Sequence, residues 1–89
     1  MKKVTPVERL SPNFDERGRG IDMIVLHYTG MLSAEDALGR LTDAAAKVSA
    51  HYVIDEDGTI YALVPEKMRA FHAGVGAWKG ETDINARSI

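Results

Sequence analysis

The sequence contains no cysteine, and this absence excludes several kinds of chemistry at once. Without thiols the chain forms neither a disulfide framework nor a thiolate metal site, and it performs no thiol redox chemistry. The absence is compatible with both a reducing and an oxidising compartment, so it does not indicate where the protein works.

Charge of one sign and long apolar runs are also scarce. Eleven Lys and Arg residues face thirteen Asp and Glu residues, which gives a formal net charge of −2. This balance provides no electrostatic reason to expect nucleic acid or an anionic membrane as a partner. No stretch approaches the roughly 18 apolar residues of a membrane span. The two N-terminal lysines are not followed by the apolar segment of a secretory signal.

The residues that are present suit one globular domain. The chain has 89 residues, of which 45% are hydrophobic and 27% are charged. We expect residues 1–20, rich in turn formers and charges, to be an irregular lead-in. The apolar run 21–26 lies between two glycines and predicts a strand that is buried on both faces and central in a sheet. Ser33 is a candidate N-cap for a helix over about 34–45.

The second half predicts a hairpin followed by a long loop. Residues 48–64 form two runs rich in β-branched and aromatic residues around an Asp57-Gly58 turn signal. Residues 65–69 could form one helical turn, with Pro65 at its first position. The stretch after Gly74 is loop-like, and a new strand is expected to begin at 88–89. This order predicts an α/β fold, a mixed sheet with flanking helices.

Three histidines are the candidates for chemistry. His27 ends the first apolar run, His51 lies in the alternating strand on the same face as Ser49 and Val53, and His72 stands beside loop glycines. For His27 the spacing leaves two interpretations open: a ring bonded to a backbone carbonyl, or a metal ligand or base at the carboxyl end of a strand. The other two could equally be structural. No pair matches a local zinc motif, so the fold itself must assemble any site.

Trp78 is the single tryptophan and lies in the glycine-rich stretch "GAWKG". It either caps the core or serves as a stacking platform for a sugar or a peptide, since an exposed loop aromatic suits recognition.

Four ordered blocks carry more information than these spacings do. They are "IVLHYTG", "VSAHYVID" with "DGTIYALV", "RAFHAGVGAWKG" and "INARSI". Together they resemble the type 2 zinc-dependent N-acetylmuramoyl-L-alanine amidases, a superfamily that includes peptidoglycan recognition proteins and phage amidases, and they are most similar to its AmiD-like branch. The resemblance runs from about Ile21 to Ile89. It implies that residues 21–89 are the N-terminal part of one amidase domain, after a lead-in over 1–20.

The resemblance also implies roles for individual residues. His27 matches a zinc ligand, so Zn²⁺ is the expected cofactor. The expected reaction is hydrolysis of the amide between N-acetylmuramic acid and L-alanine, in peptidoglycan or its turnover fragments. His51, His72 and Trp78 match positions that line the substrate groove. Ala50 stands where one branch has a catalytic tyrosine, which points to the branch that uses a glutamate.

That glutamate is expected in sequence beyond Ile89, as are two further zinc ligands. We therefore expect no catalytic acid–base group within these 89 residues, and a C-terminal remainder of the domain, possibly a separate chain, as a partner. Two alternatives stay open: a non-catalytic module that binds muropeptides, and an unrelated small interaction domain with structural histidines. The expected location is the cytoplasm, with the periplasm or cell envelope as the alternative.

Overall fold

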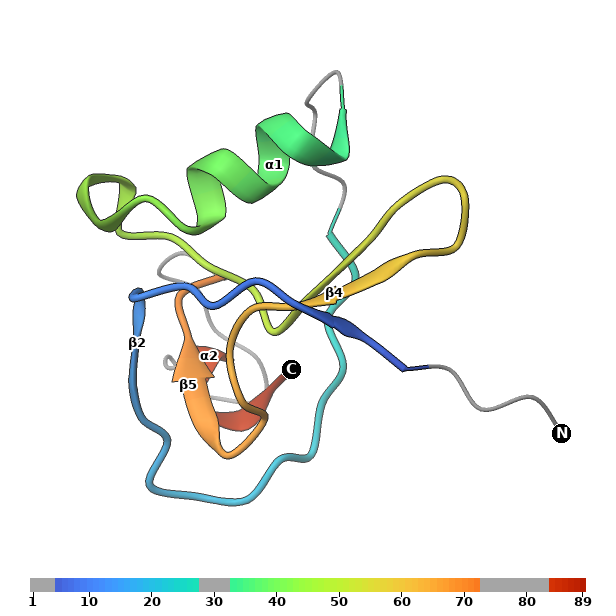
Figure 1. Cartoon of the computed structure of the whole chain (residues 1–89). Coiled ribbons are helices and arrows are strands. Elements are labelled where there is room, and N and C mark those ends of the chain that lie inside the picture. Colours follow the sequence, from blue (N-terminus) through green and yellow to red (C-terminus); the bar gives the residue numbers. More distant parts are fainter. Residues whose placement is uncertain (1–4, 28–32, 73–83) are drawn as a thin grey trace, which may run out of the picture.

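The computed structural model describes residues 5–27, 33–72 and 84–89. Its elements are short strands and short helices (Figure 1). They are, in chain order, β1 (Val7–Glu8), β2 (Phe14–Glu16), α1 (Ala34–Leu41), the 3-10 helix η1 (Ala44–Ala46), β3 (Tyr52–Ile54), β4 (Ile60–Ala62), β5 (Met68–Ala70) and α2 (Ile84–Arg87).

The strands form two small sheets. In the first the order is β1-β4-β3, with β1 parallel to β4 and β3 antiparallel to it. In the second, β2 pairs with β5 in antiparallel register. Helix α1 packs against β3 and α2 packs against β5, an arrangement that Figure 1 shows. The predicted α/β class with flanking helices is thus confirmed.

The predicted hairpin is also confirmed. Strands β3 and β4 flank a turn in which Gly58 has a φ of +88°, a conformation that favours glycine. The face assignment holds as well. Ser49, His51 and Val53 are buried, whereas Tyr52 and Ile54 on the other face are exposed. His51 therefore lies on the inner face together with Ser49 and Val53, as the two-residue period of a strand requires.

Helix α1 begins where the sequence predicts and ends earlier. The Ser33 side chain accepts a hydrogen bond from the Asp36 amide at 3.2 Å, as an N-cap does. The helix ends at Leu41 rather than near residue 45. Asp43 then caps a separate 3-10 turn by accepting a bond from the Ala45 amide at 3.0 Å. The short polar side chain at 43 competes with helix continuation, which explains the difference.

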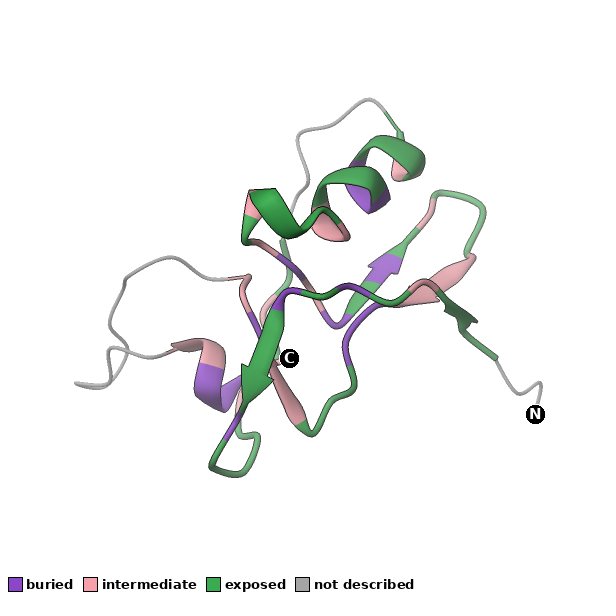
Figure 2. Cartoon of the chain, turned by 60° about the vertical axis from the view of Figure 1, so that its left-hand side comes forward, coloured by how far each residue is buried: buried purple, intermediate pink, exposed green. Residues whose placement is uncertain are grey.

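A small apolar cluster lies between α1 and the strands. Its buried members are Leu38, Val53, Leu63, Val64 and Ala70. Figure 2 shows buried positions on α1 and along the strands, with exposed residues around them. Since so few apolar residues are buried here, polar contacts must supply much of the specificity of the fold.

The prediction of an irregular lead-in is wrong, because residues 7–8 and 14–16 form strands and three polar side chains nearby are buried. Asn13 donates from Nδ2 to the carbonyls of Asp43 and Val48, both at 2.8 Å. The Ser49 hydroxyl donates to the carbonyl of Asn13 and accepts from the Phe71 amide at 2.9 Å. Polar side chains, rather than apolar ones, attach this segment to the fold. Its sequence therefore shows no apolar pattern.

Two further predictions are corrected. The run 21–26 is not a strand buried on both faces. Met23 forms one parallel bridge with Ser88, and Ile24 and Leu26 are 73% and 91% exposed. The described residues pair with this run on one side only, which explains its exposure. Residues 65–69 do not form a helical turn either. The Met68 amide closes a tight turn onto the Pro65 carbonyl at 2.9 Å, and β5 begins there.

We predict a large difference between two matched leucine truncations. Leu63 is fully buried in the cluster, whereas Leu10 is 64% exposed. Leu63→Ala leaves a cavity and should lower the free energy of unfolding by about 2–5 kcal/mol. Leu10→Ala should change it by less than about 0.5 kcal/mol. Urea unfolding of both variants beside the wild type measures this; equal losses would contradict the core described here.

Candidate functional site

The structure brings the three histidines together. His27 follows the exposed run at 24–26, His51 immediately precedes β3, and His72 lies two residues after β5. The ring centroids of His27 and His72 are 5.1 Å apart, and those of His51 and His72 are 6.0 Å apart, both with steeply inclined planes. Trp78 lies outside the described residues. The candidate site is therefore built from three separate stretches of chain, with His72 in the middle.

A chain of hydrogen bonds determines where the protons lie. The Ser88 hydroxyl donates its single hydrogen to the Ile84 carbonyl at 2.7 Å. Ser88 Oγ also lies 2.9 Å from His72 Nε2, so at this contact it can only accept, and His72 carries its proton on Nε2. His72 Nδ1 is then an acceptor. It lies 2.9 Å from Nε2 of His27, which must be the donor.

These hydrogen bonds determine which nitrogen of His27 keeps a lone pair. With its hydrogen on Nε2, the neutral ring keeps a lone pair on Nδ1, and the side chain is exposed. A histidine that binds a metal has one nitrogen bare and the other donating to a fixed acceptor, which sets both tautomer and ring orientation. His27 fits that arrangement, with His72 as the acceptor.

The segment that carries His27 is held on the α2 side. The amides of Asp22 and Val25 donate to the carbonyls of Arg87 and Ile89, both at 2.9 Å. Arg87 donates from Nε to the Asp22 carboxylate at 2.8 Å, and this hydrogen bond lowers the pKa of Asp22. These contacts hold the segment beside α2, and His27 at its end contacts His72.

His51 occupies a different environment. Its side chain is 2% exposed, and Nε2 lies 2.9 Å from the Met68 carbonyl. Nδ1 is buried and has no hydrogen-bond partner among the residues described. Burial lowers the pKa of His51, which keeps the ring neutral. Nε2 also lies 2.9 Å from Arg17 Nη2, so this nitrogen faces both an acceptor and a donor.

His72 is also neutral at ordinary pH. Burial, followed by the influence of His27, His51 and Arg17, lowers its pKa from 6.5 to about 4. Protonation of Nδ1 would remove the acceptor that His27 requires. The low pKa therefore keeps the hydrogen-bond chain intact across the physiological range.

A pocket of about 510 Å³ opens between α1, β3 and the 24–27 segment. Its lining is mainly apolar, and the three histidines and Arg40 are among its polar members. Apolar pockets with a few convergent polar groups are typical of ligand sites. The other lining residues are Ile24, Val25, Leu26, Ala37, Leu41, Val48, Ser49, Ala50, Tyr52, Val53, Ile54, Phe71 and Ile89.

Within residues 5–27, 33–72 and 84–89, no cluster of three or more His, Cys, Asp or Glu side chains could hold a metal ion. The donor chemistry nevertheless suits one ligand, His27 through Nδ1. A zinc site in a hydrolase takes three protein ligands, so two more would have to come from elsewhere.

Sequence reasoning missed Ser88, Asn85 and Arg17, all of which contact the histidines or the backbone around them. Asn85 accepts the His72 amide through Oδ1 at 3.1 Å. The block "INARSI" contributes to the family resemblance and precedes the expected strand, but none of its residues is assigned a role from the sequence. Arg17 lies in a charged stretch that carries no periodic signal. Long-range contacts of this kind leave no local pattern.

We predict that stability falls with acidification partly through His72. The unfolded chain takes up this proton near pH 6.5 and the folded chain only near pH 4. This contribution is therefore fully present above about pH 6.5 and is lost as the pH falls from 6.5 to 4. His72→Gln should flatten the slope of unfolding free energy against pH in that window. Urea unfolding of chelator-treated wild type and variant measures it, and identical slopes would contradict the assignment.

Comparisons with known proteins show the family of the chain. The family model described as N-acetylmuramoyl-L-alanine amidase matches residues 17–89. The N-acetylmuramoyl-L-alanine amidase AmiD of Escherichia coli (strain K12) is 38% identical over 76 residues, which cover 78% of this chain and 26% of AmiD. The 1,6-anhydro-N-acetylmuramyl-L-alanine amidase AmpD of Citrobacter freundii is 46% identical over 46 residues, which cover 52% of this chain and 25% of AmpD.

The fold agrees as well. The crystal structure of a selenomethionine AmpD derivative superimposes with a TM-score of 0.82 at 29% identity, covering 94% of this chain and 57% of that one. The sequence matches span about a quarter of the length of the two curated relatives. No helix among the described residues is long and apolar enough to cross a membrane. From the matched residues 17–89 and these relatives, the chain belongs to the N-acetylmuramoyl-L-alanine amidase family.

Proposed function

We propose that this chain is the N-terminal part of a zinc-dependent amidase that hydrolyses the bond between N-acetylmuramic acid and L-alanine, in peptidoglycan or its turnover fragments. Family membership and the names of both relatives support the reaction. The observation that carries the zinc proposal is the hydrogen-bond chain Ile84–Ser88–His72–His27, which leaves a lone pair on Nδ1 of His27.

His27 would hold the zinc ion. Bound zinc in a hydrolase supplies Lewis acidity, polarising a carbonyl and lowering the pKa of water to about 7. The protein residues do the rest. His72 accepts the His27 proton and orients its ring, and Ser88 fixes the tautomer of His72. We retain His72, His51 and Trp78 as proposed groove residues; both histidines line the pocket, His51 from an almost wholly buried position.

The catalytic glutamate and the two other zinc ligands are proposed to come from further sequence of the same domain. Two observations support this. The chain covers 57% of the AmpD structure it resembles, so that fold has more elements than are described here. The pocket is also bordered by apolar side chains with little cover, such as Leu26 at 91% exposure and Ile54 at 67%. Additional strands or helices would bury them.

The cytoplasm stays the proposed location, with soluble turnover fragments as substrate. Cell fractionation tests this, and a periplasmic or envelope pool of the native protein would overturn it.

We predict that His27→Ala removes zinc and amidase activity and leaves folding nearly unchanged. Its side chain is exposed, so truncation opens no core cavity and should cost less than about 0.5 kcal/mol of stability. One ligand fewer leaves too few to hold zinc in a catalytic geometry. Metal analysis of the purified full-length protein and hydrolysis of a muramyl peptide measure both effects.

His51→Ala is the control. It should retain stoichiometric zinc because no metal bond is assigned to it, although the variant should be less stable since the side chain is buried. Zinc is therefore measured at a temperature where circular dichroism shows the folded state. Zinc retained by His27→Ala but lost by His51→Ala would show that the ligand is wrongly assigned.

A second candidate function is a module that binds muropeptides without cleaving them. The mainly apolar pocket lined by the histidines favours this function, since binding a muropeptide does not depend on a complete set of zinc ligands. Calorimetric titration of the chain with a muramyl tripeptide tests this function. Binding with no hydrolysis in the full-length protein supports it, and no heat at millimolar ligand excludes it.

A further inference from the structure

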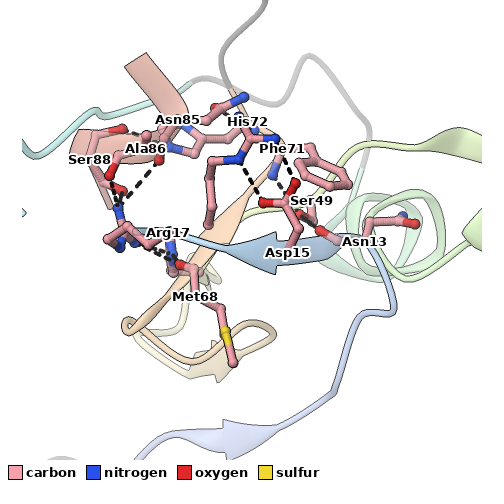
Figure 3. A network of polar contacts seen from close by, with 12 residues as sticks. Asn13, Asp15, Arg17, Ser49, Met68, Phe71, His72, Asn85, Ala86 and Ser88 are labelled. Carbon is pink, nitrogen blue, oxygen red and sulfur yellow. Dashed lines mark hydrogen bonds and ion pairs between the residues drawn. The ribbon is translucent and has the colours of Figure 1, made fainter. Parts of the chain in front are cut away.

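Arg17 is a buried cation that joins two segments next to the site. It is 7% exposed and donates to the backbone carbonyls of two separate segments (Figure 3). On the β4–β5 side, Nε and Nη2 reach the Glu66 carbonyl at 3.0 and 2.8 Å, and Nη2 reaches the Met68 carbonyl at 2.7 Å. On the α2 side, Nη1 lies 3.3, 3.1 and 2.8 Å from the carbonyls of Asn85, Ala86 and Ser88.

This guanidinium has no carboxylate at ion-pair distance among the described residues. Burial lowers the pKa of Arg17, and the charge of Glu66 opposes that effect. Five carbonyl oxygens solvate the cation in place of water. A buried charge is tolerated only when such bonds offset its desolvation, so the carbonyls and the cation depend on one another.

The α2 carbonyls that Arg17 binds belong to the residues that hold His72. Ser88 offers its carbonyl to Arg17 and its hydroxyl to His72 Nε2. Asn85 likewise offers its carbonyl to Arg17 at 3.3 Å and its side-chain oxygen to the His72 amide. Arg17 Nη2 also lies 2.9 Å from His51 Nε2, so it contacts the buried histidine directly. Figure 3 shows this cluster around His72.

We propose that Arg17 is a positioning residue for the zinc ligand. By fixing the carbonyls of residues 85–88, it places the Ser88 hydroxyl against His72, and His72 in turn keeps the proton of His27 on Nε2. The inference rests on the proposed function, in which His27 Nδ1 binds zinc. It assigns a residue outside the groove, on an N-terminal segment, to the geometry of the metal site.

The geometry also says why the residue is an arginine. Its five N–H groups point in fixed directions over a planar fork, so one side chain can serve two segments at once. A lysine presents three N–H groups at a single atom. Arg17→Lys would keep the charge and lose one of the two sets of carbonyls.

The test compares four variants of the full-length protein. Arg17→Met and Arg17→Lys alter the cation. Ser88→Ala removes only the hydroxyl that faces His72 and leaves the Ser88 carbonyl available to Arg17. Asp15→Ala is the matched control: it removes the Asp15–Arg69 ion pair at 2.7 Å on the same β2–β5 ribbon and touches none of the histidines.

Three measurements separate positioning from simple stability. Nitrogen-15 spectra of the histidine rings in the metal-free protein report the tautomer of His27, chelator competition reports zinc affinity, and thermal unfolding reports stability. We expect Arg17→Met, Arg17→Lys and Ser88→Ala each to lose the fixed Nε2–H form of His27 and to bind zinc on the order of 10-fold more weakly. Asp15→Ala should lose stability and keep both site properties.

The outcomes are distinct. If the wild type binds no zinc, the proposed function fails, while the His27 tautomer in the metal-free protein still tests the role of Arg17. If the wild type binds zinc and the folded Arg17 variants match it in tautomer and affinity, Arg17 is a structural tie only and the inference is wrong. Should neither Arg17 variant fold, a wild-type tautomer and affinity in Ser88→Ala would overturn it equally.

Discussion

The structure depends on backbone carbonyls finding donors in a chain that buries few apolar side chains. The apolar cluster has five buried members, and the N-terminal segment contributes none of them. Ser11, Asn13 and Arg17 attach that segment instead, through side-chain bonds to carbonyls of residues far along the chain. Each such bond is modest in net stability, but leaving a buried carbonyl unpaired is costly. The polar ties are thus more specific than apolar packing of the same size would be, because each needs one donor at one position.

Hydrogen bonding also determines the arrangement of the histidines. Buried surroundings keep His51 and His72 neutral, and a neutral imidazole has one donor and one acceptor. The order of donors and acceptors along the hydrogen bonds from the Ile84 carbonyl to His27 is therefore fixed, because Ser88, His72 and His27 each have a single side-chain hydrogen to donate. A change at any member affects the next one. The backbone of the four-residue helix α2 therefore determines both the geometry of the site and the positions of its protons.

Local patterns predicted the elements that local forces determine. The Asp57-Gly58 turn, the shared face of Ser49, His51 and Val53, and the Ser33 cap were all predicted, because each depends on residues within a few positions. The exposed run at 24–26 was misjudged because burial depends on what packs against a segment. Arg17 was missed for the same reason, since its partners lie 34 to 71 residues away. The family resemblance pointed to His27 from ordered blocks, and its role as a zinc ligand stays a proposal. Its contact with His72 is seen only in the folded structure.

The topology also affects the order in which contacts form during folding. Arg17 joins carbonyls separated from it by up to 71 positions, and β1 lies parallel to β4 across more than 50. Contacts at such separations form late, because the entropy of closing long loops must be overcome before they stabilise anything. During synthesis, Arg17 in the N-terminal segment therefore lacks part of its set of carbonyl acceptors until residues 85–88 have been added. The hydrogen bonds from the Ile84 carbonyl to His27 form only when these residues are in place, so the proposed zinc ligand acquires its proton order late in folding and in no earlier state.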